Sequence, residues 1–357
     1  MEIDWTSIPD SRPIPAGLSH PIETFQQSLP YARAVAALGS DVQRCVIHAV
    51  GTPIAHAQII RRSTAWGQLI YLPNGPLFAS PQSPQCRARV LDLIRRSLPG
   101  AQPRIMITNA PDQTADQDHR AAGHVPLYTP QHLALLDLSP SIADMRAGLH
   151  GKWRNALRQA ESHALTIRHS PLPVDPLHWL LRKELAQRRV RRYRSHPIAL
   201  SLALAQQGAT TTRMFIAHQG ARPVAAMLFA LHRPGATYLI GWTGSEGRKL
   251  AAHRMVLWRA MQWLKANGHL QIDLGPIETE RTAGLTRFKL GTGANPVSLG
   301  HSWLDMAPLT PLMRILRKRT AGHRHSLWPF SSNRYSGAAN NPRTPHGSAQ
   351  HRHHRPR

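Results

Sequence analysis

Two distant segments of the chain follow one pattern, and this repeat limits the folds that the sequence can adopt. The segments VIHAVGTPIAHAQII (46–60) and FIAHQGARPVAAMLF (215–229) each hold a β-rich run, a glycine turn, a Pro-Ile-Ala or Pro-Val-Ala step and a second β-rich run. Paired β-rich runs around a short glycine turn are typical of hairpins. We therefore predict two hairpins, about 170 residues apart.

Each hairpin is followed by the same three further elements. They are a β-rich run, a helical run and another β-rich run, at 67–73, 86–98 and 104–109 in one copy and at 236–242, 251–268 and 270–276 in the other. The order strand, strand, strand, helix, strand thus occurs twice, which favours duplication over chance similarity. It predicts an α/β (α+β) fold with two domains of one type in tandem.

The length of 357 residues also favours two domains, since one hydrophobic core rarely serves so long a chain. We place the first domain at 20–150 and the second at 151–305, with a linking helix at 151–164. The remainder, 306–357, opens with a basic amphipathic segment and continues in Pro, Gly, Ser, Asn and His residues that have little to bury. We expect this tail to be disordered.

The cysteine count and the hydropathy pattern predict a cytoplasmic protein. Only Cys45 and Cys86 occur, which fits a reducing compartment and supports no disulfide framework. Neither an HExxH motif nor paired Cys/His spacing is present, so we expect no catalytic metal. No apolar run approaches the roughly 18–20 residues that span a bilayer. The first residues hold acids and prolines in place of the apolar core of a signal peptide.

The formal charge of +25 indicates anionic partners, and +10 of it lies in residues 306–357, which contain no Asp or Glu. Such a field attracts nucleic acid, anionic lipid headgroups and nucleotide or pyrophosphate substrates. Residues 308–319 combine cations with an apolar stripe, so we expect peripheral attachment at the inner face of an anionic membrane. The cluster QRRVRRYRSHP, with Arg191 and Arg192, is either a polyphosphate or transfer-RNA surface or a plain charged face.

Two residues on predicted strands are candidates for chemistry. Asp273 ends the strand in IDLGP, where a carboxylate either orients and deprotonates an attacking amine or caps the next turn. Tyr238 shares a strand face with Trp242, so it either packs in the core or donates to an acyl oxygen. After this strand, GWTGSEGRKLAAH leads from a strand into a helix, an arrangement that generally favours anions.

A third candidate lies in TRFKLGTGANPV (286–297), where Lys289 follows Phe288 and precedes two glycines. From the residues alone, this lysine is either a surface side chain beside a buried Phe288 or a cation placed in an active site. Gly291 and Gly293 favour a tight bend over a phosphate loop, because no helix start follows them.

Four stretches resemble, in their order and spacing, the Fem branch of the GNAT acyltransferase superfamily. This branch comprises the FemA/FemB/FemX peptidyltransferases that build peptidoglycan cross-bridges, and relatives of unknown substrate. The stretches are TFQQSLPYARAVAALG (24–39), IYLPNGPLF (70–78), GKWRNALRQAESHALTIR (151–168) and IDLGPIETERTAGLTRFKLGTG (272–293). The resemblance spans residues 24–293 and implies two tandem GNAT-like domains with acyltransferase activity.

The resemblance also implies roles for particular side chains. Lys289 would stabilise the oxyanion of a tetrahedral intermediate, with Phe288 beside it in the substrate cleft. Lys152 and Arg154, on the linking helix, would bind the phosphates of a nucleotide-linked or lipid-linked precursor.

A coenzyme A loop of the GNAT kind would fall on Arg248, Ala251 and Ala252. Ala251 and His253 stand where that loop has glycines, and a Cβ atom limits the approach of a pyrophosphate to the backbone. Coenzyme A binding is therefore left open.

The implied reaction is the direct transfer of an acyl or aminoacyl group to an amine of a peptidoglycan-type cell-envelope precursor. Aminoacyl-tRNA or acyl coenzyme A would be the co-substrate, with no tightly bound cofactor. One alternative is a coenzyme A-dependent N-acetyltransferase that modifies a polysaccharide, a lipid or a small molecule. Another is a non-catalytic basic module that binds nucleic acid or membranes. Nothing in the sequence determines the oligomeric state.

Overall fold

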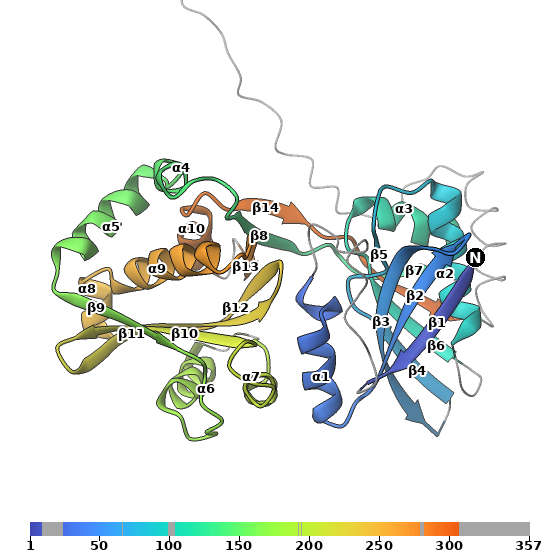
Figure 1. Ribbon diagram of the computed structural model, residues 1–357, viewed down its shortest axis with the longest axis horizontal. Helices are drawn as coiled ribbons and strands as arrows, with labels where there is room; N and C mark the ends of the chain where they lie inside the picture. Colours follow the sequence, from blue (N-terminus) through green and yellow to red (C-terminus); the bar gives the residue numbers. More distant parts are fainter. Residues whose placement is uncertain are drawn as a thin grey trace, which may run out of the picture. The chain divides into compact units, whose positions relative to one another are not determined.

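A computed structural model describes residues 1–8, 24–65, 67–98, 104–191, 193, 195–278 and 282–306. The described residues form two separate β-sheets with helices packed against them (Figure 1). The amphipathic segment at 308–319, the rest of the predicted tail and Arg192 lie outside the described residues. None of the described helices is long and apolar enough to cross a bilayer.

The first sheet is built from eight strands: β1 (Glu2–Ser7), β2 (Asp41–Ala49), β3 (Thr52–Thr64), β4 (Gly67–Leu72), β5 (Leu77–Phe78), β6 (Arg104–Asn109), β7 (Val125–Tyr128) and β15 (Ser302–Met306). Their order is β1-β2-β3-β4-β6-β15-β7, and β5 pairs with β3. Neighbouring strands are antiparallel except for β4 and β6, which run parallel.

The second sheet has seven strands: β8 (His132–Asp137), β9 (Leu165–Ser170), β10 (Thr212–Gln219), β11 (Arg222–His232), β12 (Gly235–Thr243), β13 (Gln271–Pro276) and β14 (Asn295–Ser298). Their order is β14-β8-β13-β12-β11-β10-β9. Here β12 and β13 are the parallel pair, and the other neighbours are antiparallel.

The described helices are η2 (Phe25–Gln27), α1 (Leu29–Ala37), α2 (Pro84–Ser97), α3 (Gln113–Ala122), α4 (Ile142–Ala147), α5 (Gly151–Ser162), α6 (Trp179–Arg191), α7 (Ile198–Ala205), α8 (Ser245–Lys249), α9 (Ala252–Ala266) and α10 (Ala283–Leu290). The predicted order is present twice, as β2-β3-β4-α2-β6 and as β10-β11-β12-α9-β13, with α8 added before α9. Both copies end in a parallel strand pair. The tandem GNAT-like α/β fold is thus confirmed.

Each sheet also contains one strand from the other half of the chain. β8 precedes residue 150, yet it pairs with β13 and β14 in the second sheet. β15 follows the second copy, yet it pairs with β6 and β7 in the first sheet. The domain limits at 150 and 305 remain a prediction. Each sheet, however, includes one strand that these limits would assign to the other domain.

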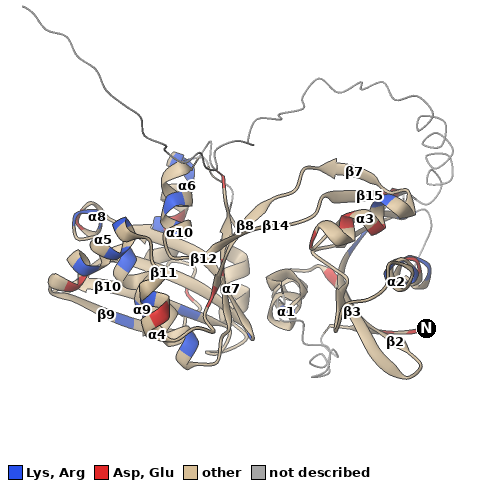
Figure 2. Cartoon of the chain, turned by 90° about the horizontal axis from the view of Figure 1, so that it is seen from above, with Lys and Arg blue, Asp and Glu red and all other residues tan. Residues whose placement is uncertain are grey.

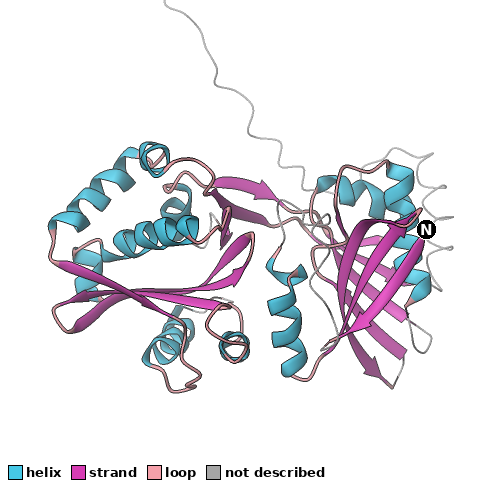
Figure 3. Ribbon diagram, viewed as in Figure 1, coloured by secondary structure: helices cyan, strands magenta, loops and turns pink. Residues whose placement is uncertain are grey.

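Helices cover both faces of the second sheet (Figure 3). Successive strand residues point to opposite faces, and β10 shows this alternation. Phe215 belongs to the apolar cluster that includes Trp258 of α9, whereas Met214 belongs to the cluster that includes Leu204 of α7. A sheet covered in this way is accessible to ligands mainly at its strand ends and where neighbouring strands part.

The connection between the two copies contains α4 and then α5, which corresponds to the linking helix predicted at 151–164. Ser141 caps α4: its hydroxyl accepts from the Asp144 backbone N–H at 3.1 Å and donates to the Asp144 carboxylate at 2.6 Å. The next helix, α5, buries Trp153 and Leu157 on its apolar stripe. The Trp153 indole N–H donates to the Phe288 carbonyl at 3.1 Å, so α5 is fixed against α10.

Candidate functional site

The second sheet opens between β12 and β13. The two strands pair only at 235–237 opposite 271–273, whereas β12 continues to Thr243. Beyond this short ladder, the edges of β12 and β13 that face each other have no partner strand in the described part of the sheet. These edges border a cavity of about 1930 Å³ that is lined by residues from both sheets.

A β-bulge alters β12 at the wall of this cavity. In the ladder with β11, Tyr238 lies opposite Phe229 and Ile240 lies opposite Leu228, so Leu239 is an extra residue. A bulge leaves the extra residue outside the regular hydrogen-bond ladder. Leu239 lines the cavity, so the bulge lies at the cavity wall.

Lys289 is a buried cation at the same cavity. It lies in the last turn of α10, with only 4% of its surface exposed. Its ammonium donates to the carbonyl of Pro276, at the end of β13, at 2.8 Å. Gly275, which has a left-handed φ of 82°, lies directly beside this ammonium, since a Cβ there would be 3.4 Å from Nζ. The lysine is therefore held in place rather than solvated at the surface.

Two carboxylates counteract the cost of burying this ammonium. Burial lowers the pKa of Lys289 to about 8, and Asp273 and Glu278 oppose the decrease. A group with this pKa is about nine-tenths protonated at pH 7. The site thus presents a poorly solvated positive charge, which is the form that stabilises an oxyanion most strongly.

Asp273 is half-buried on β13 and lines the cavity. Desolvation raises the pKa of its carboxyl, although the Gly275 backbone N–H and Lys289 act in the opposite direction. The Gly275 N–H donates to its Oδ1 at 2.7 Å. The carboxylate therefore caps the next turn while it faces the cavity, so the two roles left open by the sequence are compatible.

Tyr238 also lines the cavity, beside the bulge. A Cβ at Gly241 would overlap the Tyr238 hydroxyl, so the glycine makes room for the phenol. Burial raises the pKa of Tyr238, and the nearby Glu184 adds to the increase. The phenol thus stays protonated at neutral pH and retains a hydrogen to donate.

A polar network on α6 lines the cavity and was not predicted from the sequence. Glu184 is 2% exposed and accepts from the Tyr193 hydroxyl at 2.7 Å and from the Ser195 hydroxyl at 3.0 Å. Gln187 donates to the Gly241 carbonyl at 3.1 Å, which connects α6 to β12. Glu184 is the only acid in the otherwise basic run LLRKELAQRRVRR. This lone acid was the feature of the sequence that could have indicated the network.

The first sheet adds uncharged polar groups to the wall. The Asn109 amide donates to the Tyr71 hydroxyl at 2.9 Å, and the Asn74 amide donates to Gln26 Oε1 at 3.3 Å. All four residues line the cavity. The sequence gave no sign of this grouping, because the residues come from strands and loops far apart in the chain.

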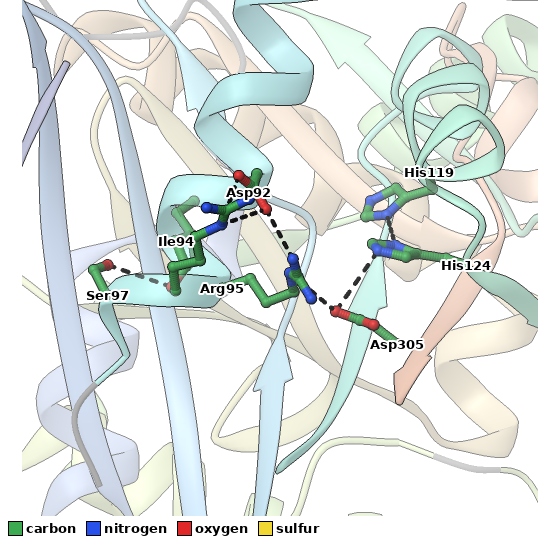
Figure 4. A network of polar contacts seen from close by, with 8 residues as sticks. Asp92, Ile94, Arg95, Ser97, His119, His124 and Asp305 are labelled. Carbon is green, nitrogen blue, oxygen red and sulfur yellow. Dashed lines mark hydrogen bonds and ion pairs between the residues drawn. The ribbon is translucent and has the colours of Figure 1, made fainter. Parts of the chain in front are cut away.

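A buried histidine pair lies behind this wall (Figure 4). Nδ1 of His119, which lines the cavity, is 2.8 Å from Nδ1 of His124. Nε2 of His124 is 3.7 Å from the Asp305 carboxylate, which also lies 3.9 Å from Nε of Arg95. Burial lowers the pKa of His119 to about 3, so its ring is neutral at pH 7.

Other predicted substrate-binding residues lie elsewhere. Lys152 is exposed, Arg154 donates to the Leu149 carbonyl at 3.1 Å, and neither lines the cavity. Phe288 packs against Trp153 and His253 with ring centroids 6.1 and 5.2 Å away, so it supports the site through packing. Arg191, in contrast, is exposed and lines the cavity.

The predicted coenzyme A loop is only partly accessible. Arg248 lines the cavity, and its guanidinium donates to the Thr243 carbonyl at 3.0 Å. Ala251, with a left-handed φ of 49°, and Ala252 are 7% and 0% exposed and do not line the cavity. A pyrophosphate in the cavity therefore has no direct access to these backbone positions. Among the described residues, no group of three His, Cys, Asp or Glu could hold a metal ion.

Comparisons with known proteins agree with this architecture. Residues 143–296 match the family model of the acetyltransferase (GNAT) domain. The crystal structure of FemX superposes with a TM-score of 0.68 at 13% identity, covering 84% of this chain and 96% of FemX. The C-terminal domain of a protein from Agrobacterium fabrum, described as a lysylphosphatidylglycerol synthetase, gives a TM-score of 0.50 at 13% identity and covers 84% of this chain and 95% of that one.

No curated protein matches the chain in sequence. At 13% identity, the two structural likenesses concern the fold. The GNAT match covers most of the second sheet, including β12, β13 and the bulge in the ladder between β11 and β12. The chain therefore contains a GNAT acyltransferase domain at residues 143–296, and its fold is similar to that of FemX.

Proposed function

We propose that the chain transfers an acyl or aminoacyl group to an amine of a cell-envelope precursor of the peptidoglycan type. The observation that carries this proposal is the placement of Lys289. Its ammonium is buried at the cavity, at the point where β12 and β13 part. A desolvated cation beside an open strand edge suits a reaction that develops negative charge on a carbonyl oxygen.

In this mechanism the amine attacks the donor carbonyl directly. A C–N bond forms, and the tetrahedral intermediate places its oxyanion between Lys289 and the bulge at Leu239. Collapse breaks the C–O bond of an aminoacyl ester, or the C–S bond of a thioester, and returns the carbonyl. Among the described residues that line the cavity there is no cysteine, which favours direct attack over a thioester intermediate.

The attacking amine must lose protons during the reaction. Asp273 accepts one, because desolvation has raised the pKa of its carboxyl and made it a stronger base than a solvated aspartate. The leaving hydroxyl or thiol takes up a proton from solvent or from the Tyr238 phenol. Tyr238 and Asp273 both face the cavity, as this division of roles requires.

We favour aminoacyl-tRNA as the donor. Its polyanionic backbone suits a chain with a formal charge of +25, and the structurally similar Agrobacterium fabrum protein is described as a lysylphosphatidylglycerol synthetase. The buried positions of Ala251 and Ala252 support the same choice, since they limit pyrophosphate binding. Acyl coenzyme A is the second candidate, because the matching family model is that of an acetyltransferase.

A transfer assay tests the proposal. Full-length protein is incubated with a cell-envelope precursor extract and either tRNA charged with radiolabelled amino acids or radiolabelled acetyl coenzyme A. Label should pass from the charged tRNA to an amine in the extract, and Lys289→Met should nearly abolish the transfer. Transfer from acetyl coenzyme A alone would select the second donor. If neither donor is used, the acyltransferase proposal for this cavity is wrong.

A further inference from the structure

The cavity differs in charge from the chain as a whole. The chain carries a formal charge of +25, and Figure 2 shows Lys and Arg along α5, α6 and α8. Among the described residues that line the cavity, the carboxylates outnumber the cations and give a formal charge of −1; they are Asp112, Asp118, Glu184, Asp273 and Glu278 against Arg87, Arg191, Arg248 and Lys289. A polyphosphate would therefore enter a cavity that lacks compensating charge.

The cations of the wall add little free positive charge to the interior. Arg87 forms a two-point ion pair with Asp118, with N–O distances of 2.6 and 3.1 Å. Lys289 lies beside Asp273, whose charge opposes the lowering of the lysine pKa. The remaining two cations, Arg191 and Arg248, are exposed, and so are two of the carboxylates, Asp112 and Glu278. The buried Glu184 is compensated from behind the wall by Arg188, whose Nη2 lies 3.5 Å from its Oε1.

The histidines of the wall do not change this balance. Burial lowers the pKa of His119 and His232 to about 3 and that of His253 to about 4. It also lowers the pKa of His196, and Arg188 adds to this decrease. All of these rings are neutral at pH 7.

The wall also contains a buried acceptor that has no donor. Asn74 is 6% exposed, and its amide nitrogen donates to Gln26 Oε1. This contact sets the orientation of the amide and leaves Oδ1 without a hydrogen-bond partner in the described structure. A buried acceptor without a donor costs about 1–3 kcal/mol, which a ligand can recover by supplying an O–H or N–H group.

His119 presents a second acceptor of this kind (Figure 4). The Asp305 carboxylate can only accept, so it favours a proton on Nε2 of His124, which leaves Nδ1 of His124 as an acceptor. The proton of the 2.8 Å contact then belongs to Nδ1 of His119. Nε2 of His119 is consequently a bare acceptor, and it too has no partner in the described structure.

We propose that the part of the acceptor that enters this cavity is an amine surrounded by hydroxyl donors, as in an amino sugar, and that it carries no phosphate. This rests on the proposed function and specifies its acceptor. The interior carries no excess of positive charge that would repel the ammonium, and the hydroxyls donate to Asn74 Oδ1 and His119 Nε2. If the acceptor has a phosphorylated carrier, that carrier lies outside, near the exposed Arg191 and Arg248.

A binding experiment without donor tests this proposal separately from catalysis. Full-length protein is titrated with D-glucosamine and with D-glucosamine 6-phosphate, which differ only in the phosphate, by calorimetry in about 0.3 M NaCl to screen the basic surface. We expect glucosamine to bind at least about tenfold more tightly, a difference of about 1.4 kcal/mol. Two substitutions each remove one of the acceptors. His119→Phe keeps an aromatic ring, and Asn74→Gly suits the left-handed φ of 48° at this position.

Each of these two substitutions should weaken glucosamine binding by about fivefold or more, the lower limit for one buried acceptor. His218→Phe is the matched control, since Nδ1 of His218 is also without a partner but His218 does not line the cavity; it should leave binding unchanged. Tighter binding of the 6-phosphate that is weakened by the same two substitutions would overturn the proposal. So would the absence of glucosamine binding. Failure of the transfer assay with intact glucosamine binding would instead reject the proposed reaction.

Discussion

Replacing Lys289 by methionine should make the protein more stable and nearly inactive. Methionine has a similar length and a good helix propensity, so the change removes the charge without opening a large cavity in α10. The decrease in the pKa of Lys289 from 10.5 to about 8 means that folding favours the neutral amine. At about 1.4 kcal/mol for each pKa unit, keeping the ammonium buried at pH 7 costs about 3 kcal/mol.

Part of this gain in stability is lost because the substitution also removes the hydrogen bond from Lys289 to Pro276. Without the ammonium, the Pro276 carbonyl loses a donor at 2.8 Å, which costs about 1 kcal/mol. We therefore expect Lys289→Met to raise the free energy of unfolding by about 2 kcal/mol at pH 7. Turnover should fall by about 10²–10³-fold, as for the loss of one oxyanion-stabilising group.

The gain in stability should depend on pH with a defined sign. Below pH 8 the lysine is protonated in both the folded and the unfolded state, and the folded state bears the full cost. Between about 8 and 10.5 the unfolded state binds the proton and the folded state does not, so wild-type stability rises with pH. The advantage of the methionine variant should therefore shrink between pH 7 and pH 10.

Urea denaturation of both proteins at pH 7 and pH 10 measures the gain in stability and its dependence on pH. The transfer assay measures the loss of turnover. Lys249→Met is the control, since Lys249 is exposed and pairs only with the surface residue Glu246. It should change neither stability nor turnover appreciably. A Lys289→Met enzyme that retains full turnover, or one that is less stable than wild type at pH 7, would refute the reasoning.

Three further predictions follow from particular contacts. Turnover should fall as pH rises through about 8, because the Lys289 ammonium is lost there; a pH profile that rises over this range would identify the lysine as a base instead. Gly291→Ala should destabilise the fold by about 1–3 kcal/mol, because the new Cβ would lie 2.7 Å from Trp153 Cδ1; chemical denaturation measures this. Ser141→Ala should cost about 1 kcal/mol through loss of the N-cap of α4, and a melting temperature equal to that of wild type would contradict it.

The sequence by itself determined the five elements of each copy and their order. The hairpins at 46–60 and 215–229 could be predicted because strand alternation, glycine turns and helical periodicity are local properties of the chain. Lys289, Asp273 and Tyr238 were also identified as candidates, and the structure places all three at one cavity.

Other features depend on residues that are far apart in the chain. β8 and β15 each belong to the sheet of the other half of the chain through long-range strand pairing, which local sequence patterns do not predict. The sequence left Lys289 as either a surface side chain or a placed cation, whereas the structure buries it in α10, which a hydrogen bond from Trp153 to the Phe288 carbonyl fixes against α5.

The tertiary structure alone decided the chemistry of the cavity. The chain is strongly basic, yet the wall carries no excess of positive charge, because Arg87 is paired with Asp118 and the other wall cations face solvent or a carboxylate. Burial sets the pKa of Lys289 and leaves Asn74 and His119 with acceptors that have no donor. Desolvation depends on which atoms surround a group in space, and that is a property of the folded chain rather than of its sequence order.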